Sequence, residues 1–514
     1  MNNSVSSKPL VRIDYLILSV FFLGAAIRLS FAITSDFPIN DGGLFYIMIK
    51  DLQNNHFSLP LYTTYNNAGI PYVYPPFAFY VAGILEQVTP FSLFDILLFL
   101  PAIITTLTIP AFYILSRDLL SKRTEVVISL FAFILIPDSF RWLIMGGGLT
   151  RSFGLLFSLL ALHHVFRLFC DNDPKRIPIA ALFCSLTVLS HPANTFFLIY
   201  SIALFFLVLR RSKTGVYYSL FLLIGTIIIT APWLFTVTSR HGFAMLMPGV
   251  DNGFTFIASI SRLLLLKITN ELLIPIWAFA CLFGFIIELI NKKYLLPLWV
   301  IVIFILHTRA ADQVAVIPLA ILAGIGGYKA LRTMFIKLES GWWYKSMRLL
   351  IIGFILIYSI VFIIVAPPQL ITPLPQSERD AMRWISLNTP ITSRILVISP
   401  TTWYLDRSSE WLPALTSRHN VSVVQGYEWM GDFSQRIEHH NALQECSSQA
   451  PDCIEKWIVS TGSSITHLYI PKPCIESFDI SIDKCGALRS ALKDDPHYRL
   501  IYDEAGATIF QYVK

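Results

Sequence analysis

The chain has 514 residues, of which 55% are hydrophobic and only 14% are charged, and its mean hydropathy is +0.61. It contains repeated apolar runs of roughly 15–25 residues, the length that a helix needs to cross about 30 Å of hydrocarbon, so the composition excludes an ordinary soluble protein. The net charge of +6 comes from basic residues in short loops, where they set membrane orientation and do not indicate nucleic-acid binding.

The apolar runs predict a polytopic α-helical membrane protein with about 11 transmembrane helices. We place these helices at residues 12–33, 93–116, 124–140, 152–169, 177–190, 193–209, 216–237, 272–290, 294–308, 313–332 and 348–366. The first run is interpreted as a retained anchor; a cleaved signal peptide ending at the small residues 29–32 is the alternative.

Basic residues cluster in alternate loops between these runs. The loops expected inside contain Lys8, Arg12, Arg117, Lys122, Arg123, Lys175, Arg176, Arg210, Arg211, Lys213, Lys292, Lys293, Lys337, Lys345 and Arg348. The positive-inside bias therefore puts the N-terminus in the cytoplasm and the C-terminal segment outside.

The first outer loop, residues 34–92, is predicted to hold two helices that lie along the membrane surface. The first is Gly43–Asn54, in which apolar residues share one face. The second covers residues 74–85, which are apolar but too few to span, and Pro75 and Pro76 start it. We expect the loop to form the floor or wall of a cavity.

The composition becomes that of a soluble protein from about residue 375. A helix is expected over Ser377–Asn388 and strands over residues 394–399, 421–424, 467–470 and 507–513. We therefore divide the chain into a transmembrane domain, residues 1–370, and an extracytoplasmic α/β domain, residues 371–514.

Four cysteines lie in this C-terminal segment. Their spacings suggest the disulfides Cys446–Cys453 and Cys474–Cys485, as expected of an exported domain. A zinc site is the alternative, but the segment has neither a C-x-x-C pair nor two histidines at the H-x(3–5)-H spacing of zinc ligands.

Two carboxylates, Asp36 and Asp41, directly follow the first predicted helix. A carboxylate fixed just outside the bilayer can act as a general base, or hold a metal, toward a substrate carried on a lipid. We predict Asp41 as the catalytic base and Asp36 as a second catalytic candidate. The alternatives are that Asp41 caps the helix Gly43–Asn54 and that Asp36 is a solvated loop carboxylate.

Four outer-face segments stand out in the sequence: residues 41–46 and 74–76 are the sharpest motifs, and residues 146–151 and 190–192 are further elements. With these motifs and the architecture of nearly the whole chain, the protein resembles the GT-C superfamily of polyprenyl-phosphate-dependent glycosyltransferases. The resemblance implies transfer of a hexose or pentose from a dolichyl- or undecaprenyl-linked donor to a glycan, lipid or protein acceptor outside the cytoplasm. Many relatives have two adjacent acidic residues, whereas here Gly42 follows Asp41, so a single base is expected and a divalent metal is the less favoured alternative.

Cations at the outer ends of the predicted spans are candidates for holding the phosphate leaving group. Arg151 follows a run of three glycines that would let a bulky head group approach, and a guanidinium binds phosphate in a bidentate manner. Interfacial snorkelling is the alternative. The further substrate-binding candidates are His191, Arg309, Tyr74, Arg262 and Lys267. Simple packing is the alternative for His191 and Tyr74, Arg309 can pair with Asp312, and the last two candidates lie in an outer loop, residues 239–271, that is long enough to form a lid.

Two other functions stay open. A transporter or flippase of lipid-linked saccharides would have ionisable residues at mid-membrane and two matching halves, which the sequence does not show. A non-catalytic scaffold whose outer domain binds a ligand fits the missing second acidic residue. Residues 410–413 and 425–429 put aromatics beside carboxylates, which suits sugar stacking or packing. We expect the C-terminal domain to position acceptor or lipid while the chemistry stays in the membrane part.

Overall fold

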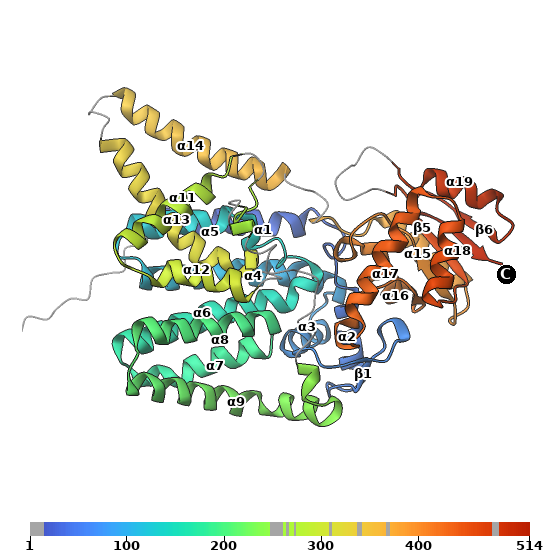
Figure 1. The fold of residues 1–514 in the computed structure, drawn as a ribbon, viewed down its shortest axis with the longest axis horizontal. Coiled ribbons are helices and arrows are strands. Elements are labelled where there is room, and N and C mark those ends of the chain that lie inside the picture. Colours follow the sequence, from blue (N-terminus) through green and yellow to red (C-terminus); the bar gives the residue numbers. More distant parts are fainter. Residues whose placement is uncertain are drawn as a thin grey trace, which may run out of the picture.

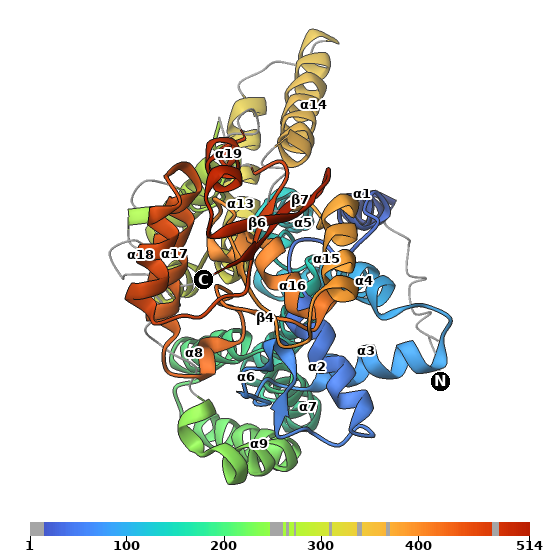
Figure 2. The same cartoon turned by 90° about the vertical axis from the view of Figure 1, so that its right-hand side faces the viewer.

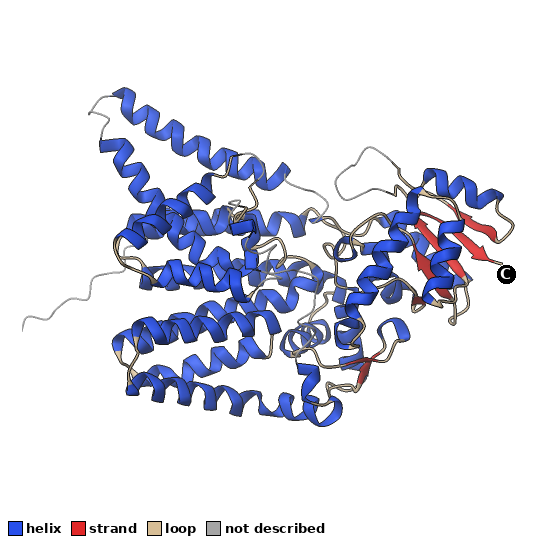
Figure 3. Ribbon diagram, in the orientation of Figure 1, coloured by secondary structure: helices blue, strands red, loops and turns tan. Residues whose placement is uncertain are grey.

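The computed structural model describes residues 15–246, 261–263, 267–271, 274–307, 311–336, 342–365, 371–474 and 483–513. Long helices fill one end of the molecule, and a sheet with its own helices forms the other end (Figure 1, Figure 3). The first outer loop lies where the two parts meet, because α2 and α3 stand between the long helices and the C-terminal elements (Figure 1).

A helix lies at each of the eleven predicted positions. These helices are α1 (Tyr15–Ile33), α4 (Leu93–Leu119), α5 (Arg123–Leu135), α6 (Leu149–Asp171), α7 (Ile177–Val188), α8 (Pro192–Leu209), α9 (Lys213–His241), α11 (Ile276–Ile290), α12 (Leu295–Leu306), α13 (Ala311–Ile336) and α14 (Trp342–Val365). Within the described residues, six of them, α1, α4, α6, α8, α9 and α13, are long and apolar enough to cross a membrane. Eleven crossings therefore stay a prediction.

Helix α9 shows how these helices present apolar side chains to their surroundings. Only 17% of its most apolar window is buried inside the structure, and Phe235 is 74% exposed. Soluble monomers rarely expose apolar patches of this extent, so lipid has to cover this face. The chain is an integral membrane protein.

Glycines allow α11 and α13 to pack closely. A Cβ added to Gly284 would lie 2.0 Å from the Leu322 carbonyl oxygen, and one added to Gly326 would lie 2.1 Å from the Ala280 carbonyl oxygen. Small residues allow such close backbone approach between membrane helices. These contacts hold α11 against α13, which also packs against α5 and α12.

The first outer loop contains the two helices that the sequence predicts. Helix α2 covers Gly43–Asn54, and α3 covers Phe77–Val88, starting two residues after the predicted proline pair begins. Between them, β1 (Tyr62–Thr63) pairs with β2 (Ile70–Pro71) in an antiparallel hairpin.

The C-terminal region contains a five-stranded mixed sheet of order β4-β3-β5-β7-β6. Figure 2 views the molecule from the end at which this region lies. Its strands are β3 (Arg394–Val397), β4 (His419–Asn420), β5 (His467–Pro471), β6 (Tyr498–Asp503) and β7 (Ala507–Tyr512). Its helices are α15 (Gln376–Asn388), α16 (Arg407–Thr416), α17 (Phe433–Glu445), α18 (Asp452–Thr461) and α19 (Gly486–Asp494). Strand β3 is parallel to β4 and β5, whereas β7 is antiparallel to β5 and β6.

Two strand predictions differ from the structure. The predicted strand at residues 421–424 is wrong, because the pairing strand β4 ends at Asn420. After Asn420, the Val397 amide of β3 donates its hydrogen bond of 3.3 Å to the Ser422 hydroxyl and not to a backbone carbonyl oxygen of the neighbouring segment. Strand β6 was not predicted; it is an exposed edge strand and therefore lacks a clear buried alternation.

Both predicted disulfides are present in the structure. Cys446 is bonded to Cys453, and Cys474 is bonded to Cys485. The pairing predicted from the spacing is confirmed, and the alternative that these cysteines hold zinc is wrong.

Candidate active site

The turn that carries Asp41 packs against the three-glycine run at the start of α6. The Gly146 amide donates a hydrogen bond of 3.0 Å to the Ile39 carbonyl oxygen, and the Gly147 amide donates one of 3.0 Å to Oδ1 of Asp41. The carboxylate is therefore held by a segment that comes about a hundred residues later in the chain.

This close approach explains the glycines. A Cβ added to Gly146 would lie 2.2 Å from the Asp41 carbonyl oxygen, and one added to Gly147 would lie 2.5 Å from Oδ2 of Asp41. The sequence suggests that the glycine run admits a bulky head group. In the structure the segment that comes close to it is the Asp41 turn.

Gly42 has a steric reason to be glycine. Its φ is +135°, and an added Cβ would lie 3.1 Å from the Gly146 Cα and 3.2 Å from the Trp411 ring. Such a φ favours glycine, and both sides of the position are occupied. A second acidic residue after Asp41 does not fit this turn.

The cap of α2 comes from Glu410 in α16, a residue that the sequence suggests only for sugar stacking or packing beside Trp411. Its carboxylate accepts hydrogen bonds from the Gly42 amide, at 3.0 and 3.1 Å, and from the Leu44 amide at 3.1 Å. The N-cap residue Gly42 has no side chain to supply such bonds, while the Asp41 carboxylate bonds to Gly147. The alternative that Asp41 caps α2 is therefore wrong.

Asp41 and Glu410 influence each other electrostatically. Burial raises the pKa of Asp41, and Arg151 and the Gly147 amide oppose this rise. Burial, and then the charge of Asp41, raise the pKa of Glu410 to about 8. Burial and the charge of Asp41 thus both disfavour ionisation of Glu410, while Arg151 favours the ionised form of Asp41.

Arg151 lies in the first turn of α6 beside a small pocket. The residues that line it are Leu143, Arg151, Leu155, His191, Ala193, Asn194, His307, Gln313 and Val314. Nη1 of Arg151 is buried and has no hydrogen-bond partner among the described residues, and the guanidinium lies 5.7 Å from the centre of the Trp142 ring. A buried guanidinium with an unused donor suits an anionic ligand.

Two other predicted residues, His191 and Tyr74, lie close to the start of α6. His191, at the start of α8, lines the pocket beside Arg151, and its ring centre is 6.1 Å from that of Tyr74. The Tyr74 hydroxyl lies 3.2 Å from that of Thr150, the neighbour of Arg151. The fold thus brings Tyr74, Arg151 and His191 together from three distant segments. His307 also lines the pocket and was missed, since no sequence pattern distinguishes it.

Asp36 is placed differently from Asp41. It is exposed and forms an ion pair with Arg379 of α15. The hydrogen bond from Arg379 lowers the pKa of Asp36. This environment is that of a surface ion pair, and Asp41 is the better candidate for a base.

Two of the candidates in the predicted lid, Arg262 and Lys267, lie within the described residues. Nη1 of Arg262 lies 3.5 Å from Oδ2 of Asp312, so this carboxylate pairs with Arg262. Lys267 is exposed. Arg309 and most of the predicted lid, residues 247–260 and 264–266, lie outside the described residues.

Two aromatic residues that the sequence places beside carboxylates, Trp411 and Trp429, serve packing. Trp411 is fully buried, and its Nε1 donates a hydrogen bond of 2.9 Å to the Asn40 carbonyl oxygen. Trp429 is 8% exposed and lies against Tyr74, with ring centres 5.3 Å apart. A role for these two rings as sugar-stacking platforms is therefore wrong, because neither presents an open face.

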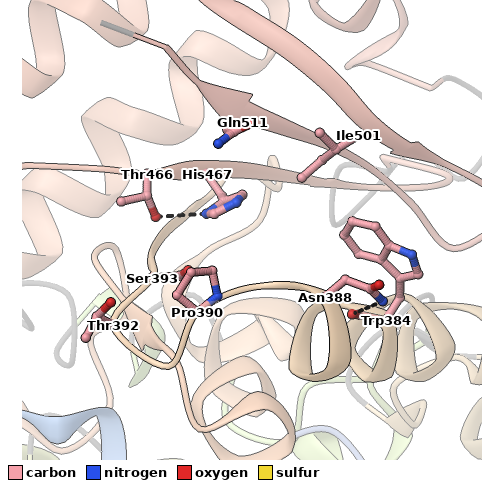
Figure 4. A pocket seen from close by; sticks show the side chains of 9 residues that line it. All are labelled: Trp384, Asn388, Pro390, Thr392, Ser393, Thr466, His467, Ile501 and Gln511. Carbon is pink, nitrogen blue, oxygen red and sulfur yellow. Dashed lines mark hydrogen bonds between the residues drawn. The ribbon is translucent and has the colours of Figure 1, made fainter.

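A larger pocket, of about 440 Å³, lies within the C-terminal region between α15 and the sheet (Figure 4). It is lined by Trp384, Asn388, Pro390, Thr392, Ser393, Thr466, His467, Ile501 and Gln511. Thr466 and His467 are hydrogen bonded to each other there, as are Asn388 and Trp384 (Figure 4). None of its lining residues belongs to the Asp41 turn, so the pocket is separate from the candidate active site.

Metal ligands are a further possibility for acidic sites of this kind. Over the described ranges, no group of three His, Cys, Asp or Glu side chains is placed to hold a metal ion. The two carboxyl groups at the turn, Asp41 and Glu410, are engaged with backbone amides.

No protein-family model matches the sequence, and no curated protein matches it. The structure is similar to that of the archaeal oligosaccharyltransferase AglB from Archaeoglobus fulgidus in complex with an inhibitory peptide and a dolichol-phosphate. The TM-score is 0.55 at 15% identity, over 89% of this chain and 69% of that one.

Two further solved structures are similar. ArnT from Cupriavidus metallidurans bound to undecaprenyl phosphate has a TM-score of 0.53 at 13% identity, over 97% of both chains. The arabinofuranosyltransferase AftD from Mycobacteria has a TM-score of 0.57 at 11% identity, over 97% of this chain and 40% of that one. All three are GT-C glycosyltransferases. The chain has the GT-C fold, and the resemblance predicted from the sequence is confirmed at that level.

Proposed function

We propose that this chain is a membrane glycosyltransferase that moves a sugar from a polyprenyl-phosphate-linked donor to an extracytoplasmic acceptor. The observation that carries the proposal is the Asp41 carboxylate, which the Gly147 amide fixes within electrostatic reach of Arg151. A base and a cation at one place are what this reaction requires.

Each residue has a distinct task in the proposed step. Asp41 accepts the proton of the acceptor hydroxyl as its oxygen forms a bond to the anomeric carbon. The bond from that carbon to the phosphate oxygen breaks, and Arg151 stabilises the charge on the released polyprenyl phosphate. His191 and His307, which line the same pocket, limit the space around the phosphate.

The structural neighbours support this class of donor. The AglB structure contains a dolichol-phosphate and the ArnT structure contains undecaprenyl phosphate. Both ligands are polyprenyl phosphates, the leaving group that the proposed reaction releases.

We place the active site outside the cytoplasm, with residues 1–370 as the membrane domain and residues 371–514 as an extracytoplasmic domain. The two disulfides support this side, because disulfides persist in oxidising compartments. The loop charges support it as well.

The direct test is to incubate the purified protein in lipid with a panel of polyprenyl-phosphate sugars and measure free polyprenyl phosphate. We expect release with at least one donor, increased by the correct acceptor and lost in Asp41→Asn. A flippase would move the donor across the bilayer without cleaving it. Failure to cleave any donor would contradict the proposal.

A further inference from the structure

Helix α16 of the C-terminal region holds the turn that carries Asp41. Besides the three hydrogen bonds to the Glu410 carboxylate, the Tyr65 hydroxyl donates one of 2.7 Å to the Glu410 carbonyl oxygen. The neighbouring Trp411 bonds to Asn40. The segment on both sides of Asp41 is therefore fastened to two consecutive residues of α16.

Because Glu410 caps α2, Asp41 does not have to do so. The first amides of a helix need acceptors, and an aspartate just before the helix commonly supplies one. Here Glu410 supplies that acceptor from another part of the chain. The Asp41 carboxylate is therefore not needed as the cap of α2. It accepts a hydrogen bond from the Gly147 amide and is available to the proposed substrate.

We propose that Glu410 is a positioning residue of the active site: by capping α2 from the C-terminal region, it fixes the Asp41 turn and keeps a second carboxyl group beside the base. This role rests on the proposed function for its catalytic consequence. It makes the C-terminal region part of the catalytic apparatus, whereas the sequence favours chemistry confined to the membrane part.

Two titratable groups face Glu410, and they come from two elements. They are Asp41 before α2 and Tyr65 from the 3-10 turn Tyr65–Asn67. Of these, Asp41 is the group whose charge acts on Glu410. The ionisation of Glu410 near pH 8 therefore reports first on the burial of its carboxyl group and then on the charge of Asp41 beside it.

Two substitutions of Glu410 separate its cap from its charge. In Glu410→Gln the side-chain oxygen still accepts hydrogen bonds from the amides, so the turn is kept while the ionisation is lost. In Glu410→Ala the cap is lost as well. Glu378→Gln is the matched control, because Glu378 is also a buried carboxyl of the C-terminal region but bonds to Ser408 and Tyr469.

The experiment measures donor cleavage against pH and amide hydrogen exchange of residues 42–44 in the full-length protein in lipid. Glu410→Ala should lower kcat by about 10²-fold, because small displacements of a catalytic group cost this much, and should speed exchange at these amides. Glu410→Gln should stay within about tenfold of wild-type kcat and keep the amides protected, but lose the inflection near pH 8. Glu378→Gln should keep both the inflection and the protection.

The proposal is overturned if Glu410→Ala has wild-type kcat and unchanged exchange at residues 42–44. Should Glu410→Ala not fold, Glu410→Gln decides: an inflection that persists overturns the proposal, and one that disappears supports it. If the wild type cleaves no donor, the proposed function fails, and amide exchange alone then decides whether Glu410 holds the turn.

Discussion

The Gly147 amide donates a hydrogen bond of 3.0 Å to the Asp41 carboxylate across 106 residues of sequence. This contact joins the first outer loop to the start of α6, the helix whose first turn carries Arg151. It gives the proposed base a fixed position and a nearby cation, and both can be tested by substitution.

Asp41→Asn should lower turnover by roughly 10²–10⁴-fold, the usual contribution of a general base. Asparagine keeps the size of the side chain and its acceptor for the Gly147 amide but removes the basicity. Donor cleavage by the purified variant is the measurement. Asp36→Asn is the control: it breaks a surface ion pair with Arg379 and should leave turnover unchanged. Equal losses in both variants would contradict the assignment.

Gly147→Ala should displace the base without removing it. The added methyl carbon would lie 2.5 Å from Oδ2 of Asp41, so one of the two groups has to move. We expect turnover to fall by about tenfold or more, with donor affinity retained. Gly353→Ala is the matched control, because nothing lies within 4 Å of that position, which is in α14. Wild-type turnover in Gly147→Ala would show that the carboxylate position tolerates movement.

The sequence predicts the helices well and the site only in part. Apolar runs locate the long helices because burial in lipid demands them, and α2 is found to the residue because its apolar face is regular. Asp41, Arg151, His191 and Tyr74 are candidates from the sequence because they stand at the ends of such runs. Their contacts join distant segments, so the sequence alone cannot show that they meet.

Glu410 could not be predicted because its role depends on where α16 docks. In the sequence Glu410 and Trp411 read as a carboxylate beside an aromatic, a pattern that suits both sugar stacking and packing. Only the tertiary contact with residues 40–44 shows that the carboxylate caps α2 and that the ring is buried. The need for glycine at positions 42, 146 and 147 could not be predicted for the same reason, because an added Cβ would meet a segment that is distant in the sequence.

Arg151→Ala should weaken donor binding more than it lowers turnover at saturation. The substitution removes a buried guanidinium with an unused donor from the pocket near Asp41. We expect affinity for the polyprenyl phosphate to fall by about 10-fold or more, as for loss of a charge-assisted hydrogen bond. Arg167→Ala, at the other end of α6 and paired with Asp118, is the control and should leave affinity unchanged. Unchanged affinity in Arg151→Ala would assign that residue to interfacial snorkelling.

The predicted orientation can be tested with a membrane-impermeant thiol reagent on intact cells. A probe cysteine at Ser434 should react and one at Ser212 should not, because the loop charges put the first outside and the second inside. Both positions are exposed in the structure. The exposed Cys170 should first be replaced by serine, since it would add its own signal. Labelling at Ser212 alone, or equal labelling, would reverse the placement of Asp41.

Ionisation of the buried Glu378 carboxyl group should lower the free energy of unfolding as the pH rises from about 5 to 8. Burial raises the pKa of Glu378 from its ordinary value of 4.5 to about 7. The folded state therefore binds this proton more tightly than the unfolded state does. The contribution of Glu378 to the free energy of unfolding is fully present below pH 4.5, declines as the pH rises, and is lost once the pH exceeds about 7. The whole contribution is about 3 kcal/mol.

Thermal unfolding of Glu378→Gln and the wild type, followed by tryptophan fluorescence over this pH range, measures the effect. The variant cannot ionise at this position, so its unfolding temperature should change less with pH than that of the wild type. Glu438→Gln, at an exposed position of α17, controls for the loss of one carboxylate. The prediction fails if the unfolding temperatures of the wild type, Glu378→Gln and Glu438→Gln all change with pH in the same way. Burial of Glu378 would then not set the stability of the C-terminal region in this range.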